Sequence, residues 1–136
     1  MVKGKLKIVV CVVFVLLLFV QPVHAEKELV VDQADVFSGS EIVQLAEEAR
    51  LLGESYGMDI VIVTTQDARG KTAREYADDF FDEQGYGIGD DYSGILFLID
   101  YDNREAYVST SGLAIRYLTD QRIESVLDAV IDGGLA

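Results

Sequence analysis

Hydrophobic positions along the chain recur with two different periods, which predict helices and strands in alternation. From Ile42 onward, apolar residues return every three or four positions, which indicates a helix with one buried face that ends near Gly57. Ser38 and Glu41 have the spacing of a capping box and mark the start of this helix. The next segment, 58–65 (MDIVIVTT), is β-branched and almost continuously apolar, so it predicts a central strand covered on both faces.

The second half of the chain repeats this order of elements and adds a hairpin. Thr72 and Glu75 form another capping-box pair, which opens a helix that stops at Gly85. Residues 94–99 predict a second buried strand, and residues 105–110 predict a strand that returns after a polar turn. A last helix follows, and its cap and apolar stripe are Thr119, Ile123, Val126, Leu127, Val130 and Ile131.

The order of these elements predicts the fold class. A strand, a helix and a second strand form a βαβ unit, so strands 58–65 and 94–99 should lie parallel with a right-handed connection. The third strand should then return antiparallel, and helices must cover both faces of the sheet. We therefore predict an α/β fold, a three-layer α/β/α sandwich with a small mixed sheet made of one parallel βαβ unit and an antiparallel hairpin.

The N-terminal residues have the pattern of a secretory signal peptide. Lysines precede an unbroken apolar run over residues 8–20, and small residues follow up to Ala25. As a helix this run spans about 20 Å, which is short of the roughly 30 Å core of a bilayer. We predict a signal peptide over 1–25, cleaved after Ala25, and one secreted or extracytoplasmic domain over 26–136, either minimal or truncated at its C-terminus. The alternative is an N-terminal membrane anchor.

Cleavage after Ala25 would restrict the chemistry that the chain can perform. The only Cys and the only His, Cys11 and His24, precede that position. The remaining chain would therefore have no disulfide and no Cys–His or Ser-His-Asp catalytic group. It would also lack any zinc or haem site that depends on Cys or His ligands.

Residues 26–136 are strongly acidic, with 24 acidic and 8 basic side chains and a formal charge of −16. This charge argues against binding to nucleic acid and to anionic lipid, which select basic patches. It permits Ca²⁺ or Mg²⁺, because both cations prefer carboxylate, carbonyl and hydroxyl oxygens. For most of these acids, solubility outside the cell is the simpler explanation.

Acidic residues near the ends of the predicted strands form the first candidate site. Asp67 follows the first parallel strand, and Asp100 with Asp102 follows the second. Ligands of open α/β sheets collect outside the carboxyl ends of such strands, so these acids could share one crevice. Asp102 and Asn103 are better explained as turn formers. Asp32, on a short extended segment, can supply a ligand or cap the next turn.

A second candidate pocket lies at the opposite edge of the sheet. Asp91 precedes strand 94–99, and the hairpin brings it toward the hydroxyl groups of residues 109–111. Asp120 opens the last helix, where a carboxylate also suits the helix dipole. A helix cap and a loop acid explain these residues equally well. The metal candidates are therefore Asp32, Asp67, Asp91, Asp100 and Asp120.

Seven segments in order resemble one family: VDQADVFS, MDIVIVTT, GKTAREYADDFF, GYGIG, DYSGILFLI, NREAYVSTSG and RYLTD. Their order and gaps over about residues 29–132 are similar to those of the TPM domain, also called the TPM phosphatase domain. The resemblance implies an extracytoplasmic or lumenal α/β/α domain linked to divalent cations, acid phosphatase activity and maintenance of membrane protein complexes. Arg104 and Asp120 match the family pattern, whereas residues 111–114 (SGLA) replace a Gly-x-Gly-x-Glu motif and lack its acid.

Two functions follow from these observations, and a purely structural fragment without a ligand is the third possibility. The first is a Ca²⁺-binding module that docks on envelope or membrane proteins, with peripheral association to the membrane as a further option. The second is a low-turnover phosphatase, in which a cation polarises the phosphoryl group and Arg104 pairs with phosphate. No nucleophile is evident in the sequence, and the acidic composition supports binding. We therefore expect the binding module.

Overall fold

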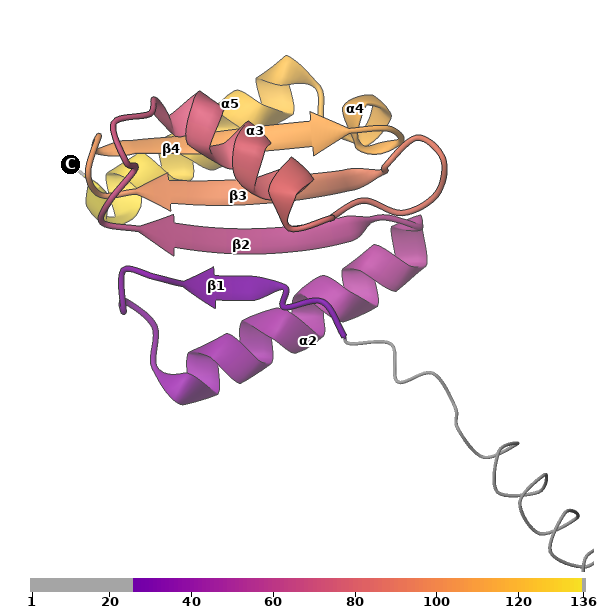
Figure 1. Cartoon of the computed structure of the whole chain (residues 1–136), viewed down its shortest axis with the longest axis horizontal. Coiled ribbons are helices and arrows are strands. Elements are labelled where there is room, and N and C mark those ends of the chain that lie inside the picture. The colour runs from indigo at the N-terminus through magenta and orange to yellow at the C-terminus, as the bar shows by residue number, and fades with distance from the viewer. Residues whose placement is uncertain (1–25, 136) are drawn as a thin grey trace, which may run out of the picture.

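The computed structural model describes residues 26–135 as alternating strands and helices (Figure 1). The elements are β1 (Val30–Asp32), α2 (Gly39–Tyr56), β2 (Asp59–Thr65), α3 (Ala73–Glu83), β3 (Gly94–Asp100), β4 (Glu105–Ser111), α4 (Ala114–Tyr117), α5 (Asp120–Val130) and the π-helical turn η1 (Ile131–Leu135). The predicted helices and strands are present close to their expected bounds. The short elements β1, α4 and η1 were not predicted. The predicted signal peptide lies outside the described residues.

The four strands form one mixed sheet in the order β1-β2-β3-β4. β1, β2 and β3 run parallel, and β4 runs antiparallel to β3. This confirms the predicted βαβ unit and hairpin. The register aligns Val61 with Leu96 and Phe97 with Val108, and consecutive side chains alternate between the two faces.

The two faces of the sheet are covered unequally. Figure 1 shows α3 crossing in front of β3 and β4. α3 covers one face, where Phe81 packs on a core of β2 and β3 side chains. These core residues are exposed by at most 1%: Val61, Val63, Leu96 and Leu98. α2 and α5 cover the opposite face, where Ile60 and Phe97 stay half-buried. The sandwich is therefore tightly closed on one side only.

Both predicted capping boxes are present. The Ser38 hydroxyl accepts a hydrogen bond from the N–H of Glu41, and the Glu41 carboxylate accepts one from the N–H of Ser38. Thr72 and Glu75 make the same pair of bonds at the start of α3. Thr119 occupies the cap position of α5, but its side chain makes no capping bond there.

The apolar stripe of α5 is covered less than its pattern suggested. Ile123 and Leu127 pack against the core beneath α5, yet none of the helix residues is buried. Ile131, which continues the stripe, is 43% exposed. The stripe stays partly exposed because α5 packs along β4, the edge strand, so that only part of the apolar side of α5 contacts the sheet.

Both hydrophobic clusters and the four-stranded sheet lie within residues 26–135, as expected of a unit that folds on its own. Within that part of the chain, no helix combines the length and the apolar character needed to cross a bilayer.

Candidate functional site

The carboxyl ends of the three parallel strands meet at one edge of the sheet, but their acids point to opposite faces. The register pairs Asp32 with Thr64 and Asp100 with Thr65. Residues paired in register share a face, and consecutive residues alternate. Asp32 therefore lies on the face that α2 covers, and Asp100 lies on the face that α3 covers. The structure does not bring these two carboxylates into one crevice.

Asp100 is a buried acid that holds the turn between β3 and β4; its exposed fraction is 0%. Its Oδ1 accepts hydrogen bonds from the N–H groups of Asp102 at 3.0 Å and Asn103 at 3.1 Å. Its Oδ2 accepts from Asn103 Nδ2 at 2.7 Å, and the same amide donates to the carbonyl of Lys71 at 2.9 Å. A buried carboxylate with three such donors organises the surrounding loops.

Asp67 and Asp102 are the exposed acids at this edge. Asp67 Oδ1 accepts a hydrogen bond from the N–H of Arg69 at 2.8 Å. Asp102 Oδ2 accepts one from the N–H of Ala68 at 3.1 Å. Each acid therefore supports the same loop with one oxygen while remaining open to solvent. This pair is the part of the predicted crevice that the structure does assemble.

Asp32 closes the loop that follows β1. Its Oδ1 accepts hydrogen bonds from the Thr64 hydroxyl and the N–H of Val36, and its Oδ2 accepts one from the N–H of Phe37 at 2.9 Å. Partial burial by itself raises the pKa of Asp32, but these three bonds together outweigh it and lower the pKa below 3.8. Asp32 is thus a carboxylate at neutral pH, with both oxygens in use.

At the opposite end of the sheet, the structure assembles only part of the second candidate pocket. The Ser111 hydroxyl donates to the carbonyl of Asp91 at 3.4 Å. Ser109 lies on the α3 face instead, where its hydroxyl donates to Asp78 Oδ1 at 2.6 Å. Asp120 is exposed in the first turn of α5. Asp91 and Ser111 therefore meet, whereas Ser109 is directed elsewhere.

The predicted metal ligands do not form a recognisable metal centre. Among residues 26–135, no three Asp, Glu, His or Cys side chains form a group that could hold a metal ion. The predicted ligands therefore stay predictions. Arg104, the predicted phosphate partner, is exposed in the β3–β4 turn with a φ of 55°. It shares this turn with Asp102 and Asp100, whose negative charges would oppose a phosphate.

Sequence reasoning missed the structural role of Ser93, which is 1% exposed. Its hydroxyl donates to Asp91 Oδ1 at 2.9 Å and accepts from the N–H of Leu113 at 2.9 Å. Ser93 thereby fastens the loop before β3 to the segment after β4. Gly112 permits this approach, because a Cβ at that position would lie 2.5 Å from Ser93 Oγ. In the sequence, the small residues Ser93 and Gly112 on either side of the hairpin were the signal that two backbone segments approach each other closely here.

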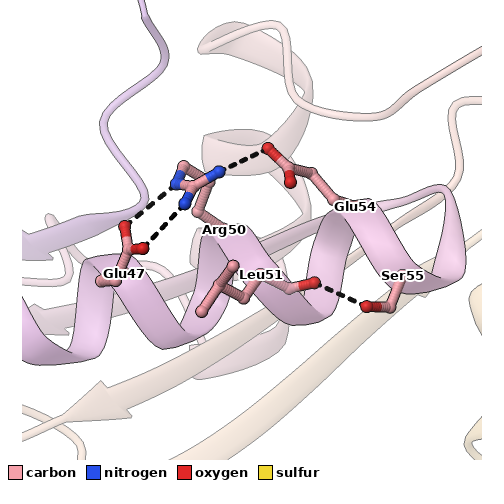
Figure 2. A network of polar contacts seen from close by, with 5 residues as sticks. All are labelled: Glu47, Arg50, Leu51, Glu54 and Ser55. Atoms are coloured by element: carbon pink, nitrogen blue, oxygen red, sulfur yellow. Dashed lines mark hydrogen bonds and ion pairs between the residues drawn. The ribbon is translucent and has the colours of Figure 1, made fainter.

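A charge network along α2 holds Arg50 (Figure 2). Its guanidinium donates to Glu47 at 3.0 and 2.7 Å and to Glu54 at 2.6 Å. These pairs lie at the surface, so each contributes little to stability. Their main effect is that two carboxylates surround one cation, which leaves this part of α2 negative.

Comparison with known proteins agrees with this architecture. The family model of the TPM domain matches residues 30–135, which is most of the chain. The chain belongs to the TPM domain family. A curated relative, the UPF0603 protein YdjH of Bacillus subtilis (strain 168), is 31% identical to this TPM domain over 131 residues. The match covers 93% of this chain, which spans about half the length (50%) of the relative.

Two solved structures share the fold of this TPM domain. The solution NMR structure of the N-terminal domain of a P. gingivalis protein matches with a TM-score of 0.66 and 18% identity, over 76% of this chain and 66% of that one. The N-terminal domain of the cg2496 protein from Corynebacterium glutamicum matches with a TM-score of 0.60 and 14% identity, over 84% and 70% respectively. At these identities the likeness concerns the fold, and it agrees with the predicted α/β class.

Proposed function

We propose that this TPM domain is an extracytoplasmic docking module, which binds envelope or membrane proteins and does not turn over a substrate. The observation that supports this most is the use of Asp100. The carboxyl edge of parallel strands is where an open α/β sheet usually gathers its functional groups. Here the buried acid of that edge accepts three hydrogen bonds from a single turn. The acid at this edge therefore holds the turn in place, and this role favours a binding domain over an enzyme.

The extracytoplasmic location is the part of the proposal that rests on sequence. Lysines, the apolar run over 8–20 and the small residues up to Ala25 form the pattern of a signal peptide. The formal charge of −16 on residues 26–136 favours partners with basic surfaces and speeds their association. A secreted acidic domain of this kind suits a role in binding.

Docking is tested with the full chain in the membranes of the cells that make it. After mild detergent solubilisation, the protein should migrate in a complex larger than the free chain, whose mass before cleavage is 15.0 kDa. Chemical cross-linking before solubilisation should retain that complex. Migration as a free chain both with and without cross-linking would contradict the docking function.

A divalent cation, Ca²⁺ or Mg²⁺, is the second part of the proposal. Asp67 and Asp102 support one loop and are exposed, so a cation could bridge them together with loop carbonyls. Thermal unfolding of residues 26–136 tests this idea. Ca²⁺ at a hundred times its Kd should stabilise the fold by about 2.7 kcal/mol.

Matched variants locate that cation. Replacing both acids, Asp67→Asn with Asp102→Asn, should abolish the stabilisation by Ca²⁺. The variant Asp91→Asn, at the other end of the sheet, should keep it. A cooperative transition that neither ion shifts would remove the cation from the proposal and leave the docking function standing.

Low-turnover, metal-assisted phosphatase activity is the alternative that the family resemblance suggests. It would place phosphate beside Arg104, where Asp100 and Asp102 oppose it electrostatically. Hydrolysis of p-nitrophenyl phosphate with Mg²⁺ or Ca²⁺ provides the test. We expect residues 26–136 to hydrolyse it no faster than the Arg104→Ala variant does. A saturable rate that Arg104→Ala abolishes would establish an enzyme instead.

A further inference from the structure

Exposed apolar side chains gather at the end of the sheet that lies opposite Asp32 and Asp100. Six large residues there, between 36% and 65% exposed, form what we call the apolar end: Tyr56, Ile88, Tyr92, Leu113, Ile115 and Tyr117. They make up half of the twelve exposed large apolar residues of the described chain. Scattered exposed residues are ordinary, whereas a contiguous patch marks an interaction site.

Direct contacts show that these residues are neighbours, although they come from three segments. The rings of Tyr56 and Tyr117 meet edge to face with centroids 5.2 Å apart, which joins α2 to α4. The N–H of Ile88 donates to the carbonyl of Ser93 at 3.0 Å, and the N–H of Leu113 donates to the Ser93 hydroxyl at 2.9 Å. The loop before β3 and the segment after β4 therefore lie side by side at this end of the sheet.

The backbone beneath the apolar end is closely packed. A Cβ at Gly87, whose φ is +103°, would lie 2.7 Å from the carbonyl carbon of Tyr92. A Cβ at Gly112 would lie 2.7 Å from the carbonyl oxygen of Asp91. No side chain would fit at either glycine, so the backbone segments lie against each other, and this close packing favours a preformed surface. A preformed surface binds without a large ordering cost.

Tyr92 has a left-handed backbone in the turn before β3, where its N–H donates to the carbonyl of Gly89 at 3.2 Å. Its φ of 51° lies in the left-handed region, which costs a bulky residue about 1 kcal/mol relative to the right-handed one. Glycine or asparagine would adopt it more easily. The ring is 65% exposed, so burial does not compensate for the strain. This backbone directs a large aromatic ring into solvent, where it is available to a partner.

A cavity of about 400 Å³ opens beside the apolar end, beneath α2. Its apolar lining includes Leu29, Met58, Ile60 and Ile88, and the last of these also belongs to the apolar end. An incoming apolar side chain could therefore enter the cavity while its neighbours cover the exposed rings. Burying an anchor of this kind supplies much of the energy of an interface.

The charges around the apolar end define what can dock there. Asp90 and Asp91 are exposed directly before Tyr92, and Glu54 is exposed near Tyr56. Of the nearby cations, Lys27 and Arg50 form ion pairs with Asp59 and with two glutamates. Arg116 is exposed within the apolar end, and Arg122 donates to the carbonyl of Tyr117 at 2.7 Å. The charge that complements a basic partner is therefore that of the domain as a whole, −16 on residues 26–136.

We propose that the apolar end is the docking surface, and that its occupant is a protein segment with apolar side chains flanked by Lys or Arg. This inference rests on the proposed docking function and specifies its surface and the chemistry of its partner. The same charge of −16 repels an anionic bilayer and a second copy of this chain. These two occupants are therefore disfavoured.

Selection from a phage-displayed library of short random peptides on residues 26–136 tests the proposal. The enriched peptides should combine Leu, Ile or aromatic residues with Lys or Arg. They should bind the variant Tyr92→Asn with Ile115→Ser about tenfold or more weakly, as expected when hot-spot residues are removed. They should bind the control Val43→Ser with Tyr101→Ser as they bind the unchanged domain. The control removes two exposed apolar residues, at 70% and 38% exposure, outside the apolar end.

Several outcomes would overturn the proposal. They are a failure to enrich peptides, enrichment of peptides without basic residues, and equal binding to both variants. Binding to phosphatidylcholine vesicles containing phosphatidylglycerol, lost in Tyr92→Asn with Ile115→Ser, would assign the surface to lipid instead. A dimer in sedimentation that the same variant dissociates would assign it to a second copy. If the variant Tyr92→Asn with Ile115→Ser does not fold, the same binding measurements are made with Tyr56→Ser, which changes the last residue of α2.

The native membrane complex separates a failure of this surface from a failure of docking itself. If the complex forms and is also present in the variant Tyr92→Asn with Ile115→Ser, the docking function is supported, but the apolar end is not the docking surface. If the unchanged chain migrates alone, the docking function fails. If the complex forms and that variant releases the chain, the result agrees with the peptide selection.

Discussion

The two ends of the sheet use their side chains in opposite ways. At the carboxyl end of the parallel strands, Asp32 and Asp100 turn toward the backbone N–H groups of their own loops. At the opposite end, Tyr92 and Ile115 are 65% and 60% exposed. The edge where an α/β sheet usually carries its chemistry is thus occupied by structural hydrogen bonds. The opposite end, where loops usually do no more than connect the strands, carries exposed apolar side chains.

This difference has a simple physical origin. A chain that leaves a parallel strand exposes backbone donors, and an aspartate at the strand end can satisfy several of them at once. At the other end, Gly87 and Gly112 let the backbones pack closely, and each side-chain acceptor serves a single backbone donor: Asp59 Oδ2 accepts from the N–H of Gly87, and Ser93 Oγ accepts from the N–H of Leu113. Side chains there are free to point outward. The comparison predicts that damage at the two ends should affect stability and binding differently.

The largest effect on stability is expected from Asp100→Ala. The substitution removes the acceptor of three hydrogen bonds at a buried position, so it should lower the free energy of unfolding by about 3 kcal/mol. Urea denaturation measures this value. The exposed neighbour Asp67→Ala, which loses one hydrogen bond, should cost about 1 kcal/mol or less. Equal losses for the two variants would show that burial of Asp100 has no structural role.

The next effect is expected from Gly112→Ala, which disturbs the frame of the apolar end. The new Cβ would lie 2.5 Å from Ser93 Oγ at a φ of +58°, so the unfolding free energy should fall by about 2 kcal/mol. Gly85→Ala has a similar φ of +71° but meets open space, and it should cost about 1 kcal/mol. A Gly112 variant no less stable than the Gly85 variant would contradict the close packing.

A smaller effect concerns Asp32 and depends on pH. Because the pKa of Asp32 is lowered in the folded state, its contribution is fully present well above pH 3.8 and is lost as the pH falls through the lower, folded value. Replacing it as Asp32→Asn should cost about 1 kcal/mol at neutral pH. The stability difference between the two proteins should shrink below about pH 4. A constant difference from pH 7 to pH 2, measured by denaturation, would exclude this linkage.

The smallest effect on stability is expected where we place the binding surface. Tyr92→Asn with Ile115→Ser removes two exposed side chains, and asparagine tolerates the left-handed backbone at position 92. The free energy of unfolding should therefore stay within about 0.5 kcal/mol of the unchanged value. Denaturant unfolding under the same conditions checks this. A loss above 1 kcal/mol would mean that the apolar end is part of the core.

Much of the fold could be predicted from the sequence, because its main elements carry strong local signals. Strands 58–65 and 94–99 are continuously apolar, and both long helices begin with a capping box. β1 escaped prediction because its three residues form a strand only through pairing with β2. The incomplete cover of α5 escaped because periodicity describes a helix but not where the helix packs.

The candidate site could be predicted less well, because it depends on register and on distant contacts. Asp100 was correctly placed at a strand end and Asp32 on an extended segment, yet only the pairing with Thr64 and Thr65 shows that they face opposite sides. The apolar end joins residues of α2, the loop before β3 and α4. No local pattern relates Tyr56 to Tyr117, which lie far apart in the sequence and meet only in the folded chain.

A map of backbone amide shifts by NMR tests the central claim most directly. The isotope-labelled domain, residues 26–136, would be titrated with a basic, apolar peptide from the library selection. The account predicts shifts confined to the last turn of α2, the loop 87–93 and the segment 112–117, with the loops 66–70 and 101–104 unchanged. Shifts centred on those two loops instead would show that the carboxyl end of the sheet is the binding surface, and would contradict the account.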